Sequence, residues 1–213
     1  DRIAESTCDE TAHTIQTPYA ATARGSLSGE GGGILVLEAL DALEARGGTA
    51  LAEVAGFAAT QSMCPDTFGC ERDPDDDAVA MVMKLAIADA GLTPDEIDAV
   101  VPFGSSIPVA DAVDRDALLD TFGDRAATLP LVLPMPFVGN VGAGIGPLSV
   151  AVAARCLVEQ KLPARIATTG VDDLAANACE ACDADLRAIV VFTTSLGGHN
   201  AAVVLKRIDG GAQ

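Results

Sequence analysis

Few side chains in this sequence are of the types that carry acid–base or nucleophilic chemistry at neutral pH. The 213 residues include two histidines, His13 and His199, and six cysteines. Histidine exchanges protons near neutral pH, and a cysteine thiolate attacks electrophilic carbonyls. Neither histidine has a carboxylate partner in the sequence that would indicate a charge-relay arrangement. We expect His13 to be exposed and His199 to be structural, with a contact at the rim of a pocket as its alternative.

None of the cysteines is predicted to be a catalytic thiol or a metal ligand. Cys156 falls inside a long apolar run without an adjacent base, so we expect it to pack in the core. Cys179 and Cys182 have the spacing of a redox or half-zinc motif, but no second Cys/His pair accompanies them. A metal or redox role for this pair stays open as the lesser alternative. Reduced thiols are expected throughout, because a chain of this size does not depend on disulfides.

A glycine-rich run at residues 29–33 (Gly-Glu-Gly-Gly-Gly) has the composition of a phosphate-binding loop. It lacks the Lys-Ser/Thr ending of a P-loop, and it precedes an apolar strand-like run, whereas a dinucleotide fingerprint follows its strand. We therefore predict that this run binds no nucleotide.

Composition and charge narrow the classes of function. The chain is 49% hydrophobic, and 13 basic against 31 acidic residues give a net charge of −18. Such a surface repels phosphate backbones and anionic lipids, so we expect no nucleic-acid partner and no membrane. The sequence shows no signal peptide and no run of about 20 apolar residues. These features predict a soluble, cytoplasmic protein.

The elements that position these residues alternate between strands and helices, which predicts an α/β fold. A continuous apolar run at residues 34–38 is expected to form a buried strand. The helix at residues 143–160 is apolar on nearly every side, so we expect it to be buried on nearly every side. Further strands are predicted at residues 51–60, 97–101, 129–133, 188–194 and 201–207, and further helices at residues 39–46, 78–90 and 111–122.

Several segments, in order along the chain, resemble the β-ketoacyl synthase family of the thiolase superfamily. Residues 24–38 resemble its R-D-G-F-V-x-G-E-G-A-G-x-L-V-L-E segment. Residues 102–108 resemble its His-Gly-Thr-x-Thr-Pro loop with Phe103 in place of the histidine. Residues 139–146 resemble its Gly-His-x-x-Gly-Ala-x-Gly loop with Asn140 at the histidine position.

The resemblance continues at other positions of the family's site. The family's P-x-x-D-x-x-E motif matches residues 108–114, with Asp114 in place of the glutamate, and its G-F-G-G-x-N turn matches residues 195–200. Met135 falls where the family has a lysine. By this resemblance, the acyl or pantetheine pocket is expected along Ser105, Ser106, Ile107, Ser195, Leu196, Gly197 and Gly198, where Leu196 replaces a gating phenylalanine and Ile107 a threonine.

The substitutions remove the chemistry that the family performs. A decarboxylating condensation requires a cysteine thiolate and two imidazoles that stabilise the thioester enolate. Phe103 donates no hydrogen bond, and Asn140 keeps a donor but does not titrate. No catalytic residue is therefore assigned, and the chain is expected to be inactive alone, although its family is one of acyltransferases.

The resemblance implies a thiolase-like fold, specifically the C-terminal half (a mixed sheet with a buried central helix) plus the end of the N-terminal half. Residues 1–48 would be the tail of the N-terminal half and residues 49–213 the C-terminal domain. A ketosynthase-like protein without its histidines resembles the chain-length factor of type II polyketide systems. That resemblance implies a heterodimer with a catalytic ketosynthase, substrates carried on acyl carrier protein phosphopantetheine, and no other cofactor.

Three alternatives remain open at this stage. The chain could be an active acyltransferase with other machinery. It could be one piece of a split β-ketoacyl synthase, active once its Cys-bearing half is supplied. It could also be the remainder of a longer chain, which the first residue, Asp1, and the abrupt start both favour.

Overall fold

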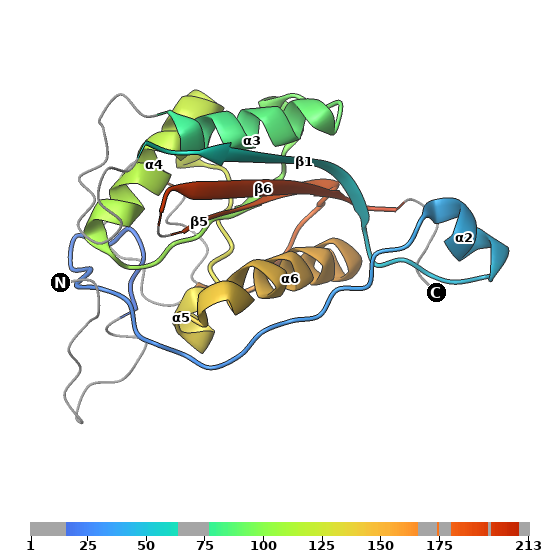
Figure 1. Cartoon of the computed structure of the whole chain (residues 1–213), viewed down its shortest axis with the longest axis horizontal. Helices are drawn as coiled ribbons and strands as arrows, with labels where there is room; N and C mark the ends of the chain where they lie inside the picture. The colour runs from blue at the N-terminus through green and yellow to red at the C-terminus, as the bar shows by residue number, and fades with distance from the viewer. Residues whose placement is uncertain (1–15, 64–76, 166–173, 175–179, 196, 209–213) are drawn as a thin grey trace.

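The computed structural model describes residues 16–63, 77–165, 174, 180–195 and 197–208. Its centre is a four-stranded mixed sheet in the order β1-β6-β5-β2 (Figure 1). β6 is antiparallel to both of its neighbours, whereas β2 and β5 run parallel. The strands are β1 (Glu53–Gln61), β2 (Ala99–Val101), β5 (Ala188–Thr194) and β6 (His199–Lys206), and a separate pair joins β3 (Lys161–Leu162) to β4 (Cys182–Asp183).

Helices cover both faces of this sheet. α3 (Ala78–Asp89) and α4 (Pro108–Phe122) pack on one face, and α6 (Ile145–Glu159) packs on the other (Figure 1). The result is a three-layer α/β arrangement, as the sequence predicted. The shorter elements are α2 (Leu40–Ala45), α5 (Met135–Val138) and the 3-10 turns η1 (Pro94–Glu96), η2 (Gly123–Ala127) and η3 (Gly142–Gly144).

The side chains of β5 divide between two cores. Val190 and Phe192 belong to the cluster under α3 and α4, whereas Ile189 and Val191 belong to the cluster under α6. Successive side chains of a strand point to opposite faces, so a strand covered on both faces must be apolar throughout. This explains why residues 188–192 form a continuous apolar run.

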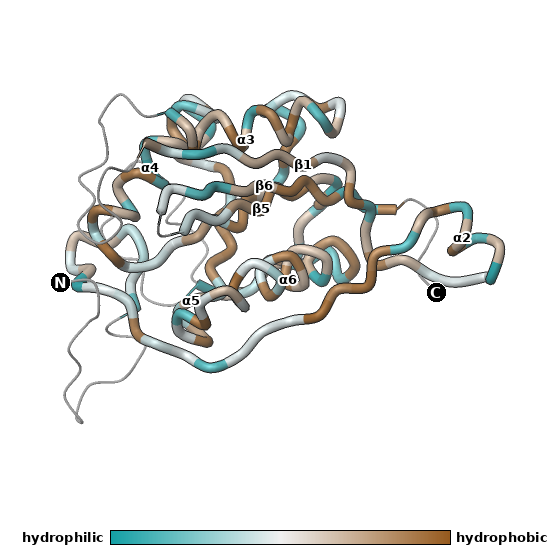
Figure 2. The backbone as a smooth tube through the Cα atoms, viewed as in Figure 1, coloured by the Kyte–Doolittle hydropathy of each residue, from teal (hydrophilic) through white to brown (hydrophobic). Residues whose placement is uncertain are grey.

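The predicted buried strand at residues 34–38 is wrong. Ile34 and Val36 are 96% and 88% exposed, and these residues form an extended segment that runs beside α6 (Figures 1 and 2). A strand requires a neighbour for its backbone groups, and no described strand lies next to this segment. The strand predicted at residues 129–133 is likewise reduced to one parallel bridge, between Leu131 and Val100.

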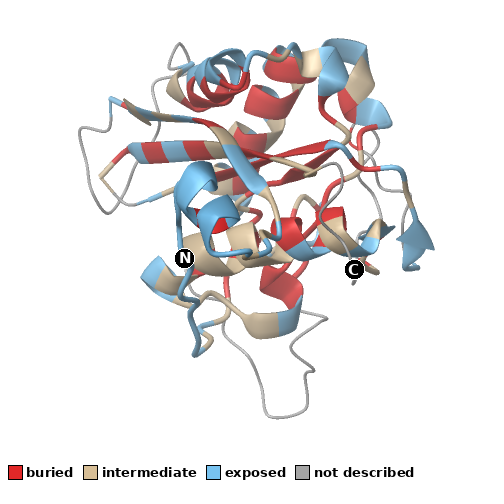
Figure 3. Ribbon diagram, turned by 90° about the vertical axis from the view of Figure 1, so that its right-hand side faces the viewer, coloured by how far each residue is buried: buried red, intermediate tan, exposed pale blue. Residues whose placement is uncertain are grey.

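α6 is less buried than its composition predicted. Its sheet-facing side chains, such as Ala153 and Leu157, are buried, but most of the others are half-buried (Figure 3). The 18-residue stretch Gly142–Glu159 has a mean hydropathy of 1.3, and only 28% of it is buried. By length and composition alone it could cross a membrane, a test that core helices of soluble proteins also pass. Part of its apolar surface is uncovered in the described structure.

Candidate functional site

Two loops and one turn emerge at the same end of the sheet. β2 and β5 run parallel, so the residues after each strand lie at one edge. The segment that leads to α5 ends at the same edge, because Leu131 pairs in parallel with Val100 of β2. We call residues 102–107, after β2, loop A, and residues 139–144, after α5, loop B. Ligands of open α/β sheets bind outside the carboxyl ends of strands, so this edge is the candidate site.

Loop A has a left-handed backbone at two positions. Gly104 has a φ of 51° and Ser106 a φ of 65°. Their backbone N–H groups donate to the carboxylates of Asp114 and Asp111, respectively, each at 3.1 Å. Ser105 donates its Oγ–H to Asp111 at 3.3 Å. A left-handed conformation costs a non-glycine residue about 1 kcal/mol, so these hydrogen bonds help to hold Ser106 in place.

The four predicted site residues of loop A differ in exposure. Phe103 and Ile107 are half-buried, whereas Ser105 and Ser106 are completely buried. Ser105 also accepts the backbone N–H of Ile107 at 3.2 Å, where Ile107 precedes the first turn of α4. The hydroxyl of Ser105 therefore serves the loop itself. Its role in a pocket stays a prediction.

Asn140 is fixed in loop B by the segment that precedes α2. Its backbone N–H donates to the carbonyl of Leu27 at 2.7 Å, and its own carbonyl accepts the N–H of Gly29 at 3.0 Å. The side-chain Oδ1 accepts the N–H of Gly142 at 3.0 Å. These contacts hold the asparagine by its backbone and by one side of its amide.

The glycine run at residues 29–33 packs directly against loop B. A Cβ on Gly29 would overlap the carbonyl oxygen of Val138, and a Cβ on Gly144 would overlap that of Gly31. Gly139 has a φ of 73°, and a Cβ on it would lie 2.9 Å from the Cα of Gly29. Glycine is required here because two backbones touch. Gly29 therefore has a structural role in the packing of this run on loop B.

The positions of the family's histidines and lysine hold no group that titrates. Phe103 offers no hydrogen bond. Met135 is buried at the start of α5, where its sulfur accepts a hydrogen bond from Ser26 Oγ at 3.9 Å. Within the described part of the chain, the Nδ2 of Asn140 donates no hydrogen bond. These positions can offer an acyl carbonyl a neutral donor but no proton-transferring group.

The β5–β6 turn forms a tight hairpin at the same edge. Ser195 is exposed, and its backbone N–H donates to the carbonyl of His199 at 2.9 Å. Gly198 is buried with a φ of 82°, and its carbonyl accepts the N–H of Ser62 at 2.7 Å. Gly197 accepts a hydrogen bond from the Gln61 side chain. Leu196 lies outside the described residues, as does His13 elsewhere in the chain.

Asp111 is a buried carboxylate with an altered proton affinity. Burial raises the pKa of its carboxyl to about 6, although hydrogen bonds from Tyr19, Ser105 and Ser106 lower it. Only 4% of the residue is exposed. Its oxygens are occupied by loop A and by Tyr19, so the carboxylate acts as a structural acceptor.

The two described cysteines, Cys156 and Cys182, differ in exposure. Cys156 is buried in α6, as predicted, and burial raises the pKa of its thiol to about 11, with Glu159 adding to the effect. Cys182 is exposed, and Cys179 lies outside the described residues, so the spacing motif stays untested. Among the described side chains, no group of three His, Cys, Asp or Glu residues is placed to hold a metal ion.

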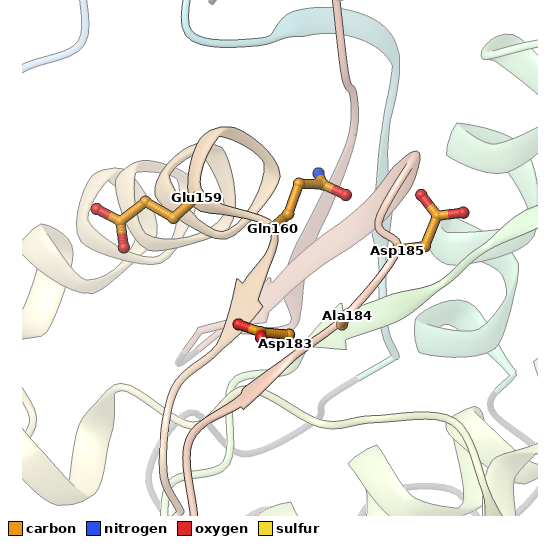
Figure 4. A pocket seen from close by; sticks show the side chains of 5 residues that line it. All are labelled: Glu159, Gln160, Asp183, Ala184 and Asp185. Atoms are coloured by element: carbon orange, nitrogen blue, oxygen red, sulfur yellow. The ribbon is translucent and has the colours of Figure 1, made fainter.

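An open depression of about 460 Å³ lies at the far end of α6. The carboxylates of Glu159, Asp183 and Asp185 at its rim point in different directions (Figure 4). Gln160 instead ties α6 to the start of β5, because its amide donates to the carbonyl of Leu186 and accepts the N–H of Leu186, each at 2.9 Å. Gln160 therefore has a structural role at the rim of this depression.

Sequence reasoning missed two residues that organise loop A. Gln16 and Tyr19 lie in a stretch that shows no clear period, and their contacts to loop A and α4 span 89 to 95 positions. No local signal indicates contacts of this separation. The sole signal in the sequence is that Tyr19 is the chain's one tyrosine.

Comparison with known proteins gives the same family. The sequence model of the beta-ketoacyl synthase C-terminal domain matches residues 51–169. The chain is 29% identical over 199 residues to 3-oxoacyl-[acyl-carrier-protein] synthase 2 of Staphylococcus aureus, covering 92% of this chain and 47% of that protein. It is 32% identical to granaticin polyketide beta-ketoacyl synthase 2 of Streptomyces violaceoruber, covering 88% and 44%. The chain thus spans about half the length of these relatives.

Solved structures show the same fold. The ishigamide ketosynthase/chain length factor superposes with a TM-score of 0.79 at 26% identity, over 95% of this chain and 48% of that one. A complex of a type II polyketide acyl carrier protein with its ketosynthase, AntDE:AntF, gives 0.82 at 19% identity, over 96% and 50%. With the family match covering more than half of its residues, the chain belongs to the beta-ketoacyl synthase family and has a thiolase-like ketosynthase fold.

Proposed function

We propose that this chain is a non-condensing, ketosynthase-like subunit of the chain-length factor type, which pairs with an active ketosynthase in polyketide or fatty-acyl chain elongation. One observation carries the proposal: loops A and B keep hydrogen-bonded backbones while their histidine positions hold Phe103 and Asn140. Decarboxylation needs charged or strongly polar donors for the developing enolate. A site that keeps this backbone scaffold without those donors suits the binding of an acyl chain and the shaping of its pocket, without condensation.

The relatives suggest the partners. One similar structure pairs a ketosynthase with a chain-length factor, and another holds an acyl carrier protein with its ketosynthase. By analogy, the partner of this chain is a catalytic ketosynthase. The substrate would arrive on the phosphopantetheine of an acyl carrier protein in the cytoplasm, and no further cofactor would be required.

Co-expression with a candidate ketosynthase tests this function. We expect the two chains to co-purify and to elongate acyl chains together. The chain alone should neither condense acyl groups nor decarboxylate malonyl-acyl carrier protein. Replacement of the partner's nucleophilic cysteine by alanine, as the control, should abolish condensation by the pair. Turnover by this chain alone would contradict the proposal.

A second candidate function is that of one half of a synthase, active once a Cys-bearing half is supplied. The exposed apolar side chains of Ile34, Val36 and Leu37 favour it, because they offer apolar surface that a second half would cover. Supplying the Cys-bearing half of a relative distinguishes the two functions. A true half-enzyme would then condense acyl groups and lose activity in Asn140→Ala. A non-condensing subunit would be stabilised by that half but would stay inactive.

A further inference from the structure

One stretch of chain, residues 16–29, contacts both loops of the candidate site, and we call it the clasp. At its start, the buried side chain of Gln16 donates to the carbonyl of Ser105 in loop A at 2.9 Å. The same amide accepts the N–H of Leu27 at 2.8 Å. Leu27 in turn accepts the N–H of Asn140 in loop B. The clasp thereby connects loop A to loop B through a continuous series of hydrogen bonds.

Tyr19 is the clasp residue that reaches α4. Its backbone N–H donates to Oδ2 of Asp111 at 2.8 Å, and its hydroxyl donates to Oδ2 of Asp114 at 3.4 Å. Tyr19 has a φ of 63°, a left-handed conformation that costs an aromatic residue about 1–2 kcal/mol. The hydrogen bonds to Asp111 and Asp114 help to retain this backbone conformation.

The same two carboxylates hold loop A. Asp111 accepts N–H groups from both Tyr19 and Ser106, and Asp114 accepts the Tyr19 hydroxyl and the N–H of Gly104. Each carboxylate therefore bridges the clasp and one left-handed residue of loop A. Tyr19 lies at the clasp end of both bridges.

We propose that Tyr19 is a positioning residue, which couples the clasp to loop A through Asp111 and Asp114 and so sets the backbone of the predicted acyl or pantetheine pocket. The ring alone would fill the space, but it would leave Asp114 without one of its donors. The proposal rests on the proposed function only in taking this pocket as the ligand site. The coupling itself is independent of the ligand.

The electrostatics of the cluster support this role. Burial raises the pKa of the Tyr19 hydroxyl well above 10, and the nearby Asp114 and Asp111 raise this pKa further. The buried guanidinium of Arg165 has the opposite, smaller effect and lowers it. The hydroxyl therefore keeps its proton and remains a donor at neutral pH. A deprotonated phenol would place a third negative charge beside the two carboxylates.

A spectroscopic titration isolates Tyr19, because the chain has one tyrosine and no tryptophan. In the wild-type chain, we expect tyrosinate absorbance to develop well above the pH at which a free tyrosine ionises. Asp114→Asn should shift the midpoint toward that of free tyrosine, because it removes both a charge and a hydrogen-bond acceptor. An ordinary midpoint in the wild-type chain would overturn the assignment.

Hydrogen exchange tests the coupling directly. We expect Tyr19→Phe to speed amide exchange at Gly104 about three- to tenfold, because Asp114 accepts both the Tyr19 hydroxyl and the N–H of Gly104, with α3 unchanged. Thr17→Val is the matched control, because it removes a buried clasp hydroxyl for which the described structure shows no hydrogen-bond partner. The affinity of the chain for hexanoyl-pantetheine should fall by a similar factor in Tyr19→Phe alone.

The two readouts separate the two proposals. Wild-type exchange rates in Tyr19→Phe, or an equal acceleration in Thr17→Val, would overturn the positioning role of Tyr19. If the wild-type chain binds no thioester while Tyr19→Phe still loosens loop A, the proposed function fails and the positioning role is supported.

Discussion

Asp111 makes an unusual contribution to stability as pH changes. Its carboxyl has a pKa of about 6 in the folded chain, and an unfolded aspartate has a pKa of about 4. Between these values the folded chain keeps a proton that the unfolded chain has lost. The free energy of unfolding from this group therefore falls as pH rises from about 4 to about 6, by about 3 kcal/mol in all.

Asp111→Asn should abolish this part of the pH dependence, as measured by urea unfolding between about pH 4 and pH 7. It should also lower stability at neutral pH, because an amide cannot accept hydrogen bonds from both sides as the carboxylate does. Asp116→Asn, at an exposed site on the same helix, is the control and should keep the slope. An unchanged slope in Asp111→Asn would contradict the assignment.

Cys156 should be chemically inert. Burial and the neighbouring Glu159 raise the pKa of its thiol to about 11, so almost no thiolate forms at neutral pH. Iodoacetamide should modify the exposed Cys182 and spare Cys156 in the folded chain. Peptide mass spectrometry measures both sites in one sample, and unfolding in urea should make Cys156 reactive. Comparable labelling of both thiols before unfolding would show that α6 is not packed as described.

Among the elements, the packing of the glycine run on loop B depends on the absence of one methyl group. We expect Gly29→Ala to lower the free energy of unfolding by about 1–3 kcal/mol, because its Cβ would overlap the carbonyl of Val138. Gly146→Ala is the matched control, because it lies in α6 with open space around it and should be neutral or stabilising. Urea unfolding measures both, and equal stability of the two variants would contradict the contact.

Elements defined by local pattern could be predicted from the sequence. The strand at residues 188–194 matches β5 in both bounds, and the helix predicted at residues 78–90 matches α3 within one residue. Their apolar period and flanking turns are encoded locally. The run at residues 34–38 is also mainly apolar, but no described strand lies beside it. Composition therefore predicted its tendency to form a strand but could not supply a neighbour.

The sequence indicated the segments of the candidate site but not the hydrogen bonds between them. Motif resemblance identified loops A and B, together with Phe103 and Asn140. It did not indicate that Tyr19 contacts Asp114, because 95 positions separate them and Tyr19 lies in a stretch without a clear period. Tertiary hydrogen bonds of this kind depend on the folded arrangement.

The whole molecule has one apolar side that its own described residues leave uncovered. The side chains of Ile34, Val36 and Leu37 are exposed. They belong to an apolar extended segment that runs beside α6 (Figure 2). α6 is itself only partly buried. Contiguous exposed apolar surface of this kind indicates a protein interface. The segment is also free to accept a strand, because no described strand pairs with it. We therefore expect the isolated chain to self-associate and to bind an apolar dye.

Val36→Glu should suppress both effects, because it places a charge at the centre of this surface. The thermal midpoint should change little, since a side chain that is 88% exposed contributes little packing. Val109→Glu makes the same change at an exposed position on α4 and should leave self-association as it was. Sedimentation velocity and co-purification with a candidate ketosynthase measure the outcome. If Val36→Glu and Val109→Glu behave alike in both assays, the apolar segment mediates neither self-association nor binding to the proposed partner.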